Sequence, residues 1–285
     1  MPDAPNTSLG GSADLLGMRS QQVQSLRKLL RRRRERVAQG RFGIEGPGLV
    51  LEALASDLTV EQVFVGVDQV DSEVVAVARG HGVSVLVVDD RAITAIGSTA
   101  TPQPVYAVAL LPQHDLSTRL SGSVDPVVLV LADVSDPGNA GTLLRAGEVA
   151  GVDLFIAAGD TVDLFGPKCV RSSAGSIFRM PTVVERDTEA VLRELQSVGV
   201  RSYSAALDAT TAFTAVDLTG PVALIVGNEA HGTALAPELL AGEIQIPMSG
   251  RTESLNVAMA GTLVVYEVFR QRNQSLLPPP TNSTP

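Results

Sequence analysis

Short apolar runs alternate with helical segments through the second half of the chain, and this alternation constrains the fold more than any other feature. Apolar strands are expected at 127–132, 154–158, 182–185, 201–206, 223–226 and 243–247, with helices at 139–150, 167–177 and 188–198. Strands that are apolar on both faces are typical of a parallel sheet covered by helices on both sides. Residues 127–273 are therefore predicted to form an α/β domain.

A smaller α/β domain is predicted before it, at 19–111. Helices are expected at 21–39, 72–80 and 91–98, strands at 60–67, 83–88 and 105–111, and a Gly/Pro turn leading into a helix at 42–55. Residues 112–126 are polar and rich in breaking residues, which indicates a linker. Residues 1–18 and the proline-rich end at 274–285 are expected to be disordered.

Composition excludes several classes of site. The single cysteine, Cys169, cannot form an internal disulfide, and the three histidines are too scattered for a metal-ligand spacing. Residues 1–18 are polar and rich in Gly and Ser, unlike a signal peptide, and no apolar run reaches 18 residues, so we expect a cytoplasmic protein with no membrane partner. No metal is expected.

Positive charge is concentrated in one segment of an acidic chain. The net charge is −9, yet residues 27–36 contain seven of the 22 basic residues and one acid, which leaves 15 basic and 30 acidic residues elsewhere. Such a segment is either a surface for phosphate groups or a solvated helix face. Repulsion among the seven cations favours phosphate. The candidates are Arg27, Lys28, Arg31, Arg32, Arg33, Arg34 and Arg36.

Three polar patches follow predicted strands of the larger domain, where parallel sheets place their ligands. The first, DPGNAGTLLR, contains Asn139 at the opening of a helix and Arg145 further on. A helix that begins at Asn139 would set the two side chains ~120° apart around its axis, so a loop start would suit a shared site better. The alternative is a turn with an exposed arginine.

The second patch, LIVGNEAHG, runs from a strand into Gly227, a position where a ligand can approach the backbone. Thr233 stands where a phosphate-binding loop needs lysine, which excludes an NTPase, and no GxGxxG follows a strand. His231 is given no catalytic role, because a lone histidine is more often structural.

The third patch, IPMSGRTESLNVAMA, is a strand, a polar loop and a helix. Ser254 is the predicted N-cap of a helix at 255–270, which leaves Asn256 unexplained just inside it. The backbone near Ile246 and Leu255 could offer amides and carbonyls to a flat ring, although a plain corner is the alternative. A fourth patch, KCVRSSAG, fits a phosphate site or a basic helix face equally well.

In this order, NAGTLLR, IVGNEAHG and IPMSGRTESLNVAMA resemble the three motifs of the SpoU (TrmH) family of RNA ribose 2′-O-methyltransferases, in the SPOUT superfamily. The resemblance covers 127–272, and SSAG at 172–175 also fits. Residues 25–54, with F-x-x-E-G-x-x-x-V-x-E-A-L at 42–54, resemble a substrate-binding domain of ribosomal-protein-like fold. The resemblance implies a trefoil-knotted methyltransferase domain preceded by a smaller RNA-binding domain. It also implies a homodimer, in which small residues of the last helix, Ala258, Ala260 and Gly261, would meet the partner.

The resemblance also implies roles for individual residues. The methyl donor S-adenosylmethionine would be held by the backbone of Gly227, Ile246 and Leu255, with Leu207 added by location only. The expected catalytic residues are Asn139, Arg145, Glu229, Ser254 and Asn256.

Arg145 has two possible roles, proton removal and gripping of RNA phosphate. An arginine stays protonated to above pH 12, so we favour phosphate gripping with ribose orientation. Asn139 would orient the ribose or Arg145, and Glu229 would brace its loop.

The implied reaction is methyl transfer to a ribose 2′-hydroxyl, which requires mainly positioning. Only RNA carries that hydroxyl, and the extra N-terminal domain favours rRNA, 23S rRNA in particular, over tRNA. The alternatives are a tRNA ribose methyltransferase, a non-catalytic RNA-binding protein of the same fold and an enzyme that methylates a base nitrogen.

Overall fold

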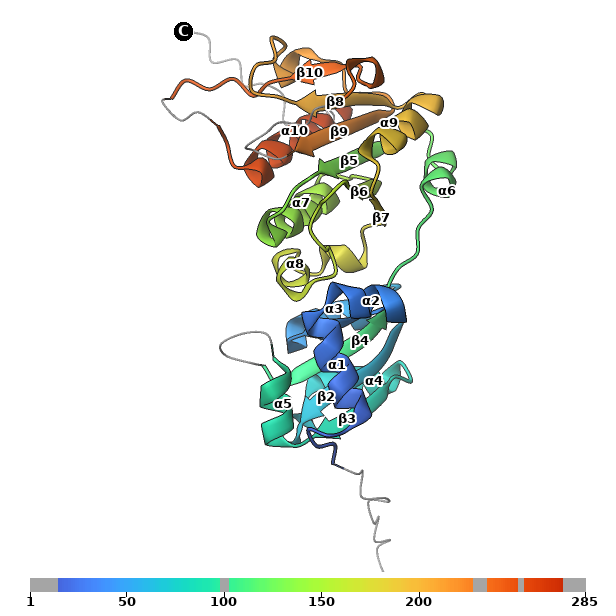
Figure 1. Ribbon diagram of the computed structural model, residues 1–285, viewed down its shortest axis with the longest axis vertical. Helices are drawn as coiled ribbons and strands as arrows, with labels where there is room; N and C mark the ends of the chain where they lie inside the picture. Colours follow the sequence, from blue (N-terminus) through green and yellow to red (C-terminus); the bar gives the residue numbers. More distant parts are fainter. Residues whose placement is uncertain (1–14, 98–102, 228–234, 251–253, 274–285) are drawn as a thin grey trace, which may run out of the picture. The chain divides into compact units, whose positions relative to one another are not determined.

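The computed structural model describes residues 15–97, 103–227, 235–250 and 254–273. The chain divides into two compact units, each described by itself below (Figure 1). Unit 1 comprises Met1–Ala55 and Thr59–Leu110, and unit 2 comprises Ser56–Leu58 and Leu111–Pro285.

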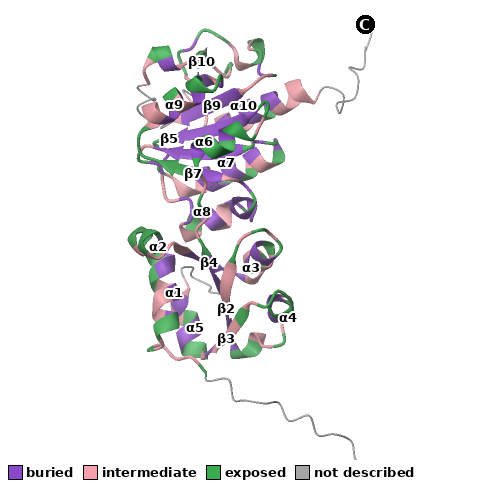
Figure 2. Cartoon of the chain, turned by 90° about the vertical axis from the view of Figure 1, so that its right-hand side faces the viewer, coloured by how far each residue is buried: buried purple, intermediate pink, exposed green. Residues whose placement is uncertain are grey.

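Unit 1 is a four-stranded sheet between two helical layers. Its strands lie in the order β1-β4-β2-β3, with β4 antiparallel to both of its neighbours and β2 parallel to β3. Figure 2 shows α1 and α5 on one side of this sheet and α3 and α4 on the other. The strands are β1 (Arg41–Glu45), β2 (Val60–Gly66), β3 (Ser84–Val88) and β4 (Val105–Leu110); the helices are α1 (Gln21–Arg31), α2 (Arg33–Gln39), α3 (Pro47–Leu54), η1 (Val67–Gln69), α4 (Glu73–Gly80) and α5 (Asp90–Ile96).

Two features of unit 1 differ from the sequence prediction. The helix expected at 21–39 is broken at Arg32, whose backbone is extended (φ −132°, ψ 113°), so α1 and α2 are separate. β1 was not predicted, because its five residues include a glycine and show no alternation. Pairing with β4 along its whole length makes it a strand, which is a tertiary effect that local propensity does not contain.

Unit 2 contains a six-stranded, wholly parallel sheet in the order β10-β8-β9-β5-β6-β7, which confirms the predicted α/β class. The central strands β5, β6 and β9 are apolar and buried, because helices cover both faces of the sheet (Figure 2). The strands are β5 (Val127–Ala132), β6 (Leu154–Ala158), β7 (Thr182–Glu185), β8 (Arg201–Ala205), β9 (Val222–Gly227) and β10 (Gly242–Ile244); the helices are α6 (Leu116–Ser121), α7 (Pro137–Val149), α8 (Pro167–Ser172), η2 (Ser176–Phe178), α9 (Thr188–Ser197), η3 (Phe213–Ala215), η4 (Pro237–Leu239) and α10 (Val257–Arg272).

The two faces of this sheet are covered by different helices. On one face, side chains of α6 and α9 join alternate residues of β5, β6 and β9 in a continuous apolar core. On the other face, α10 packs against β9 and α7 (Figure 1). The suggested linker at 112–126 therefore contains a helix, α6, whose Leu116 and Leu120 are buried in the core of unit 2.

Candidate functional site

The first and third sequence patches meet at one side-chain hydrogen bond. Asn256 Nδ2 donates to Asn139 Oδ1 over 3.0 Å, although the two residues are 117 positions apart in the chain. Asn139 lies in the first turn of α7 and Asn256 immediately precedes α10. The fold thus joins the two helix starts that the sequence picked out separately.

Asn256, and not Ser254, is the N-cap of the last helix. Its Oδ1 accepts from the backbone N–H groups of Ala258 (2.9 Å) and Met259 (3.3 Å), and α10 begins at Val257, two residues later than predicted. This corrects the N-cap assignment and explains the polar residue that the sequence left unexplained. Because the oxygen is engaged by the helix, the amide nitrogen has to face Asn139, which fixes the direction of their bond.

The start of α7 is capped in a similar way. The helix begins at Pro137, and the Oδ1 of its N-cap Asp136 accepts from the backbone N–H of Asn139 (2.9 Å). The other oxygen of Asp136 pairs with Lys168 Nζ at 2.9 Å. The hydrogen bond from Lys168, followed by that from Asn139, lowers the pKa of the Asp136 carboxyl. Asp followed by Pro at the first helical position is a helix-start signal that is already visible in the sequence.

Asn139 and Arg145 lie on the same helix, in line with the helix predicted at 139–150, so no loop start brings them into one place. Six helical residues separate their Cα positions by ~9 Å along the axis and ~120° around it. Asn139 is half-buried against Asn256, whereas Arg145 is exposed and has no hydrogen-bond or ion-pair partner in the described ranges. The two side chains therefore act at different places, one inside the site and one on its surface.

The four positions assigned to the cofactor gather at one edge of the sheet. β10, β8 and β9 are neighbouring parallel strands, so their carboxyl ends share an edge. Leu207 follows β8, Gly227 ends β9 opposite Ala132, and Ile246 follows β10. Leu255 directly precedes the N-cap of α10, which packs on β9. This is the edge at which parallel sheets place their ligands.

Backbone groups at this edge are available to a ligand. Over the ranges that the structure describes, neither Ile246 nor Leu255 forms a backbone hydrogen bond, and both are partly exposed. Leu207 is 59% exposed. An apolar side chain beside free amide and carbonyl groups matches a flat heterocycle with donors and acceptors on its edge, such as adenine.

The fourth patch supports α7 from behind. Ser172 Oγ donates to the Pro137 carbonyl (3.0 Å), and Ser173 Oγ donates to the Val170 carbonyl (2.8 Å). A Cβ at Gly141 would lie 1.9 Å from Ser172 Oγ, so α8 can approach α7 this closely only at a glycine. These hydroxyls and Lys168 are engaged in structure, so a phosphate site here is not supported.

The last helix is fixed at its far end as well. Gln271 donates to the Val216 carbonyl (2.9 Å) and accepts from the backbone N–H of Leu218 (2.8 Å). Arg272 donates to the carbonyls of Asp125 (2.8 Å) and Gly220. With Asn256 bonded at the other end, α10 is attached to the rest of unit 2 through both termini.

Small residues of α10 serve packing inside the unit. Gly261 is buried, and a Cβ there would lie 2.4 Å from Leu143 Cδ2 of α7. Ala258 is also buried. The expectation that Ala258 and Gly261 meet a partner subunit is therefore wrong, because this chain already covers them, whereas the partly exposed Ala260 stays a candidate.

Two kinds of chemistry find no support among the described residues. Burial, and then the charge of Asp163, raise the pKa of the Cys169 thiol to about 12, so it stays protonated and is not a nucleophile. No cluster of three or more His, Cys, Asp or Glu side chains suited to a metal occurs in the ranges described. Glu229 and His231 lie outside those ranges, while Ser254 is partly exposed two residues before Asn256.

The basic segment does not present all seven cations to solvent. Five of the cations are exposed: Lys28, Arg31, Arg32, Arg33 and Arg34. Arg27 is half-buried. Arg36 is only 5% exposed, and its guanidinium donates to the Leu29 carbonyl. Arg36 therefore connects α2 to α1 across the break at Arg32. Because it is buried, it is excluded from the candidate RNA contacts.

Comparison with known families gives two matches along the chain. Residues 126–266 match the SpoU rRNA Methylase family, and residues 20–107 match the MRM3-like substrate binding domain. The first match spans the edge described above, and the second spans the basic segment.

Individual relatives cover most of the chain. It is 34% identical over 251 residues to the 23S rRNA (guanosine(2553)-2′-O)-methyltransferase RlmP of Bacillus subtilis (strain 168), covering 88% of this chain and 96% of that protein. It is 34% identical over 207 residues to the 23S rRNA (guanosine-2′-O-)-methyltransferase RlmB of Xanthomonas axonopodis pv. citri (strain 306), covering 70% and 83%. The crystal structure of an AdoMet-bound rRNA methyltransferase from Sinorhizobium meliloti superposes with a TM-score of 0.77 at 28% identity, covering 93% and 99%.

Proposed function

Because the chain belongs to the SpoU rRNA methylase family, we infer that it transfers a methyl group from S-adenosylmethionine to a ribose 2′-hydroxyl of 23S rRNA. The expected family, reaction and methyl donor are confirmed. The observation in the structure that carries the inference is the Asn139–Asn256 hydrogen bond, which places two family motifs against each other beside the carboxyl edge of the sheet.

The cofactor fits the edge formed by Gly227, Ile246 and Leu255. We propose that the free backbone groups of Ile246 and Leu255 bind its adenine and that Leu207 covers one side of it. When bound, S-adenosylmethionine supplies a methyl group already activated on a sulfonium. The task of the protein is to hold the ribose 2′-oxygen in line with this methyl group and to prevent other orientations of the ribose.

We assign the polar residues of the site to positioning. Asn139 is locked by Asn256 and would orient the ribose, with Ser254 beside it. Arg145 is exposed and unpaired in the described part of the chain, which suits a group that grips RNA phosphate and fits a general base poorly. The proposed role of Glu229 is to brace the loop after β9.

Unit 1 is proposed to hold the RNA substrate. Its exposed cations, Lys28 and Arg31 to Arg34, provide affinity that does not depend on base sequence and that weakens as salt rises. Arg27 is a weaker candidate, since it is half-buried.

A chain that acts on rRNA would work in the cytoplasm. None of the described helices has the length and apolar character needed to cross a membrane.

We propose that two copies assemble through the exposed face of α10. Met259, Leu263 and Tyr266 are 60%, 44% and 51% exposed and follow one another at i, i+4 and i+7, so they form one apolar stripe. A two-fold axis would set this stripe on one copy against the same stripe on the other.

We also propose that the C-terminal part of unit 2 forms the trefoil knot that the family resemblance implies.

The dimer can be tested by light scattering coupled to size exclusion. Leu263→Glu places a charge in the stripe, and we expect the mass to fall from that of two chains to that of one. Val198→Glu is the control, because Val198 is an apolar residue of comparable exposure (51%, against 44% for Leu263) beyond the end of α9. A Leu263→Glu variant that keeps the mass of two chains would refute this interface.

The reaction is tested with labelled S-adenosylmethionine and transcripts of 23S rRNA and tRNA. We expect label in 23S rRNA at a nucleotide whose 3′ phosphodiester resists alkaline cleavage, because a 2′-O-methyl removes the internal nucleophile. Label in tRNA alone would assign the other substrate, and an alkali-sensitive product would indicate base methylation. Binding of RNA without binding of S-adenosylmethionine in calorimetry would identify a non-catalytic protein.

A further inference from the structure

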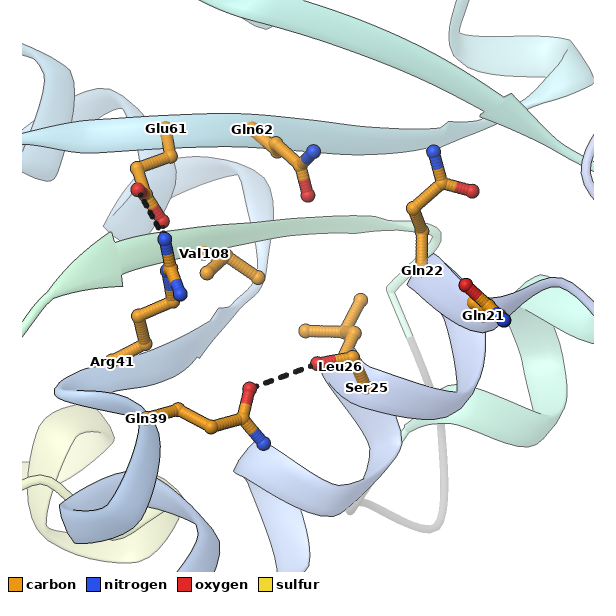
Figure 3. A pocket seen from close by; sticks show the side chains of 9 residues that line it. All are labelled: Gln21, Gln22, Ser25, Leu26, Gln39, Arg41, Glu61, Gln62 and Val108. Atoms are coloured by element: carbon orange, nitrogen blue, oxygen red, sulfur yellow. Dashed lines mark hydrogen bonds and ion pairs between the residues drawn. The ribbon is translucent and has the colours of Figure 1, made fainter.

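A polar pocket of about 360 Å³ lies in unit 1, between the start of α1 and the strands β1, β4 and β2. Its walls carry the amides of Gln22, Gln39 and Gln62, and its floor is Leu26 and Val108 (Figure 3). The volume is at the lower end of the range for small-molecule sites, which suits one flat ring. No role assigned above to the chain uses this pocket.

A β-bulge builds one wall of the pocket. The register between β2 and β4 shifts between Val60 and Gln62, so Glu61 is the extra residue in its strand. Successive strand residues normally point to opposite faces, but a bulge re-aims a side chain. As a result Glu61 and Gln62 both line the pocket, and in Figure 3 Gln62 extends from β2 into the space toward α1.

The charges of the pocket cancel. Arg41 binds both carboxylate oxygens of Glu61, with Nη2 2.9 Å from Oε1. The hydrogen bond from Arg41 lowers the pKa of Glu61, so the pair stays ionised at neutral pH. An entering phosphate would be repelled by the Glu61 carboxylate, while the charge of Arg41 is already neutralised by that carboxylate and two of its five N–H donors are engaged. The pocket therefore suits an uncharged polar group better than an anion.

Two of these amides, those of Gln22 and Gln62, are available for such a group, whereas Gln39 is engaged by Ser25 and Glu35. Within the described part of the chain, Gln62 has no side-chain hydrogen bond, and Gln22 uses only its oxygen, which accepts from Ser20 Oγ (2.9 Å). Each amide nitrogen offers two donors, and the oxygen of Gln62 adds an acceptor. Donors and acceptors above the apolar floor of Leu26 and Val108 match the edge and the face of a nucleobase.

We propose that this pocket binds the base of one unpaired nucleotide of the RNA substrate, an inference that rests on the function proposed above. Gln21, Ser25 and Lys28 follow one another on α1 at i, i+4 and i+7, so the exposed Lys28 lies along the same stripe as two residues of the pocket. Its ammonium group binds the phosphate beside the captured base. Unit 1 thus reads a splayed-out nucleotide in addition to the charge of the backbone.

The test replaces amides by side chains of similar size. In the full chain, Gln62→Met and Gln22→Met together are expected to weaken binding to a 23S rRNA transcript roughly tenfold. The dependence of the affinity on salt stays unchanged, because no phosphate contact is lost. Gln69→Met, in η1 of the same unit and outside the pocket, is the control and keeps full affinity. Thermal unfolding measured on each variant confirms that unit 1 is folded.

An abasic scan of the RNA identifies the captured nucleotide. Removing one base in an unpaired stretch is expected to weaken wild-type binding by about the same factor and to cause no further loss in the double variant. Equal affinities of the double variant and wild type, or additive losses at every abasic position, would overturn the proposal. Calorimetry of S-adenosylmethionine and the methylation assay are run in parallel. If wild-type protein methylates rRNA while the pocket variants bind normally, this inference fails alone; if wild type neither binds the cofactor nor methylates, the proposed function has failed.

Discussion

The edge of unit 2 and the pocket of unit 1 use the same side-chain chemistry in opposite ways. At the edge, both ends of the Asn256 amide are engaged, one by α10 and one by Asn139. In the pocket, the amide of Gln62 has no partner in the described residues. A methyl-transfer site needs groups fixed before the substrate arrives, whereas a surface that binds a pliable RNA can order its side chains on contact. The engaged amide of Asn256 therefore suits a site that is fixed in advance, and the unpaired amide of Gln62 suits a site that forms on contact with its ligand.

The largest effect should come from Arg145, the exposed cation further along α7 from the locked amides. Arg145→Ala is expected to lower the rate of methyl transfer by roughly 100-fold or more, because a group that positions the RNA backbone at the reacting centre is lost. Binding of S-adenosylmethionine, measured by calorimetry, should be unchanged. Arg193→Ala on α9, whose guanidinium pairs with Glu189, is the control. Full activity of Arg145→Ala would remove it from the site.

The locked amide itself can be dissected with two substitutions. Asn256→Ala removes the N-cap, which should cost about 1 kcal/mol and lower the melting temperature by roughly 2–4 °C. Asn256→Asp keeps an oxygen for Ala258 and Met259 but removes the donor to Asn139. We expect it to melt like wild type and to transfer methyl roughly tenfold more slowly. Equal activity of Asn256→Asp and wild type would show that the bond serves stability alone.

The basic segment should divide into surface and structural cations. Lys28→Ala is expected to weaken rRNA binding a few-fold and to reduce the slope of log affinity against log salt by about 1. Arg36→Met should leave that slope unchanged and destabilise unit 1 by about 1–3 kcal/mol, because the buried Leu29 carbonyl loses its donor. Filter binding across a salt series and thermal unfolding separate the two outcomes. A changed slope for Arg36→Met would return it to the RNA surface.

The smallest effect concerns pH. The pKa of Asp136 is lowered in the folded chain, chiefly by Lys168, so its contribution to stability is complete above the ordinary value near 3.8 and is lost as pH falls through the folded value. Lys168→Met should raise this pKa part of the way back, since the Asn139 N–H remains. An NMR titration of the Asp136 carboxyl carbon measures it. Asp115, whose pKa is lowered by Ser117 and Thr118, is the internal reference.

Apolar periodicity was sufficient to predict the parallel sheet of unit 2. Strands at 127–132, 154–158 and 182–185 have the predicted bounds. The first two are fully buried, and such strands are recognisable as unbroken apolar runs. β1 escaped prediction, since only its pairing with β4 makes it a strand. α6 was taken for linker because its polar surroundings concealed the buried Leu116 and Leu120.

The site was predictable as a set of motifs but not as a geometry. The resemblance picked out Asn139, Arg145 and Asn256, and nothing in their spacing told which of them would touch. The cap at Asn256 and the burial of Arg36 depend on contacts between distant segments, which no local pattern records. The pocket of unit 1 was missed for the same reason: a bulge brings Glu61 and Gln62 to one side, and its register shift is set by β4.

The attachment of α10 at both ends has a consequence for the timing of activity during protein synthesis. The helix is the last element of the described chain, and Asn256 completes the amide pair with Asn139, which the ribosome makes more than a hundred residues earlier. Unit 1 and its cations emerge first, so under the proposed role of unit 1 a nascent chain can hold RNA before it can modify it. The amide pair at the sheet edge therefore forms only after α10 has been made.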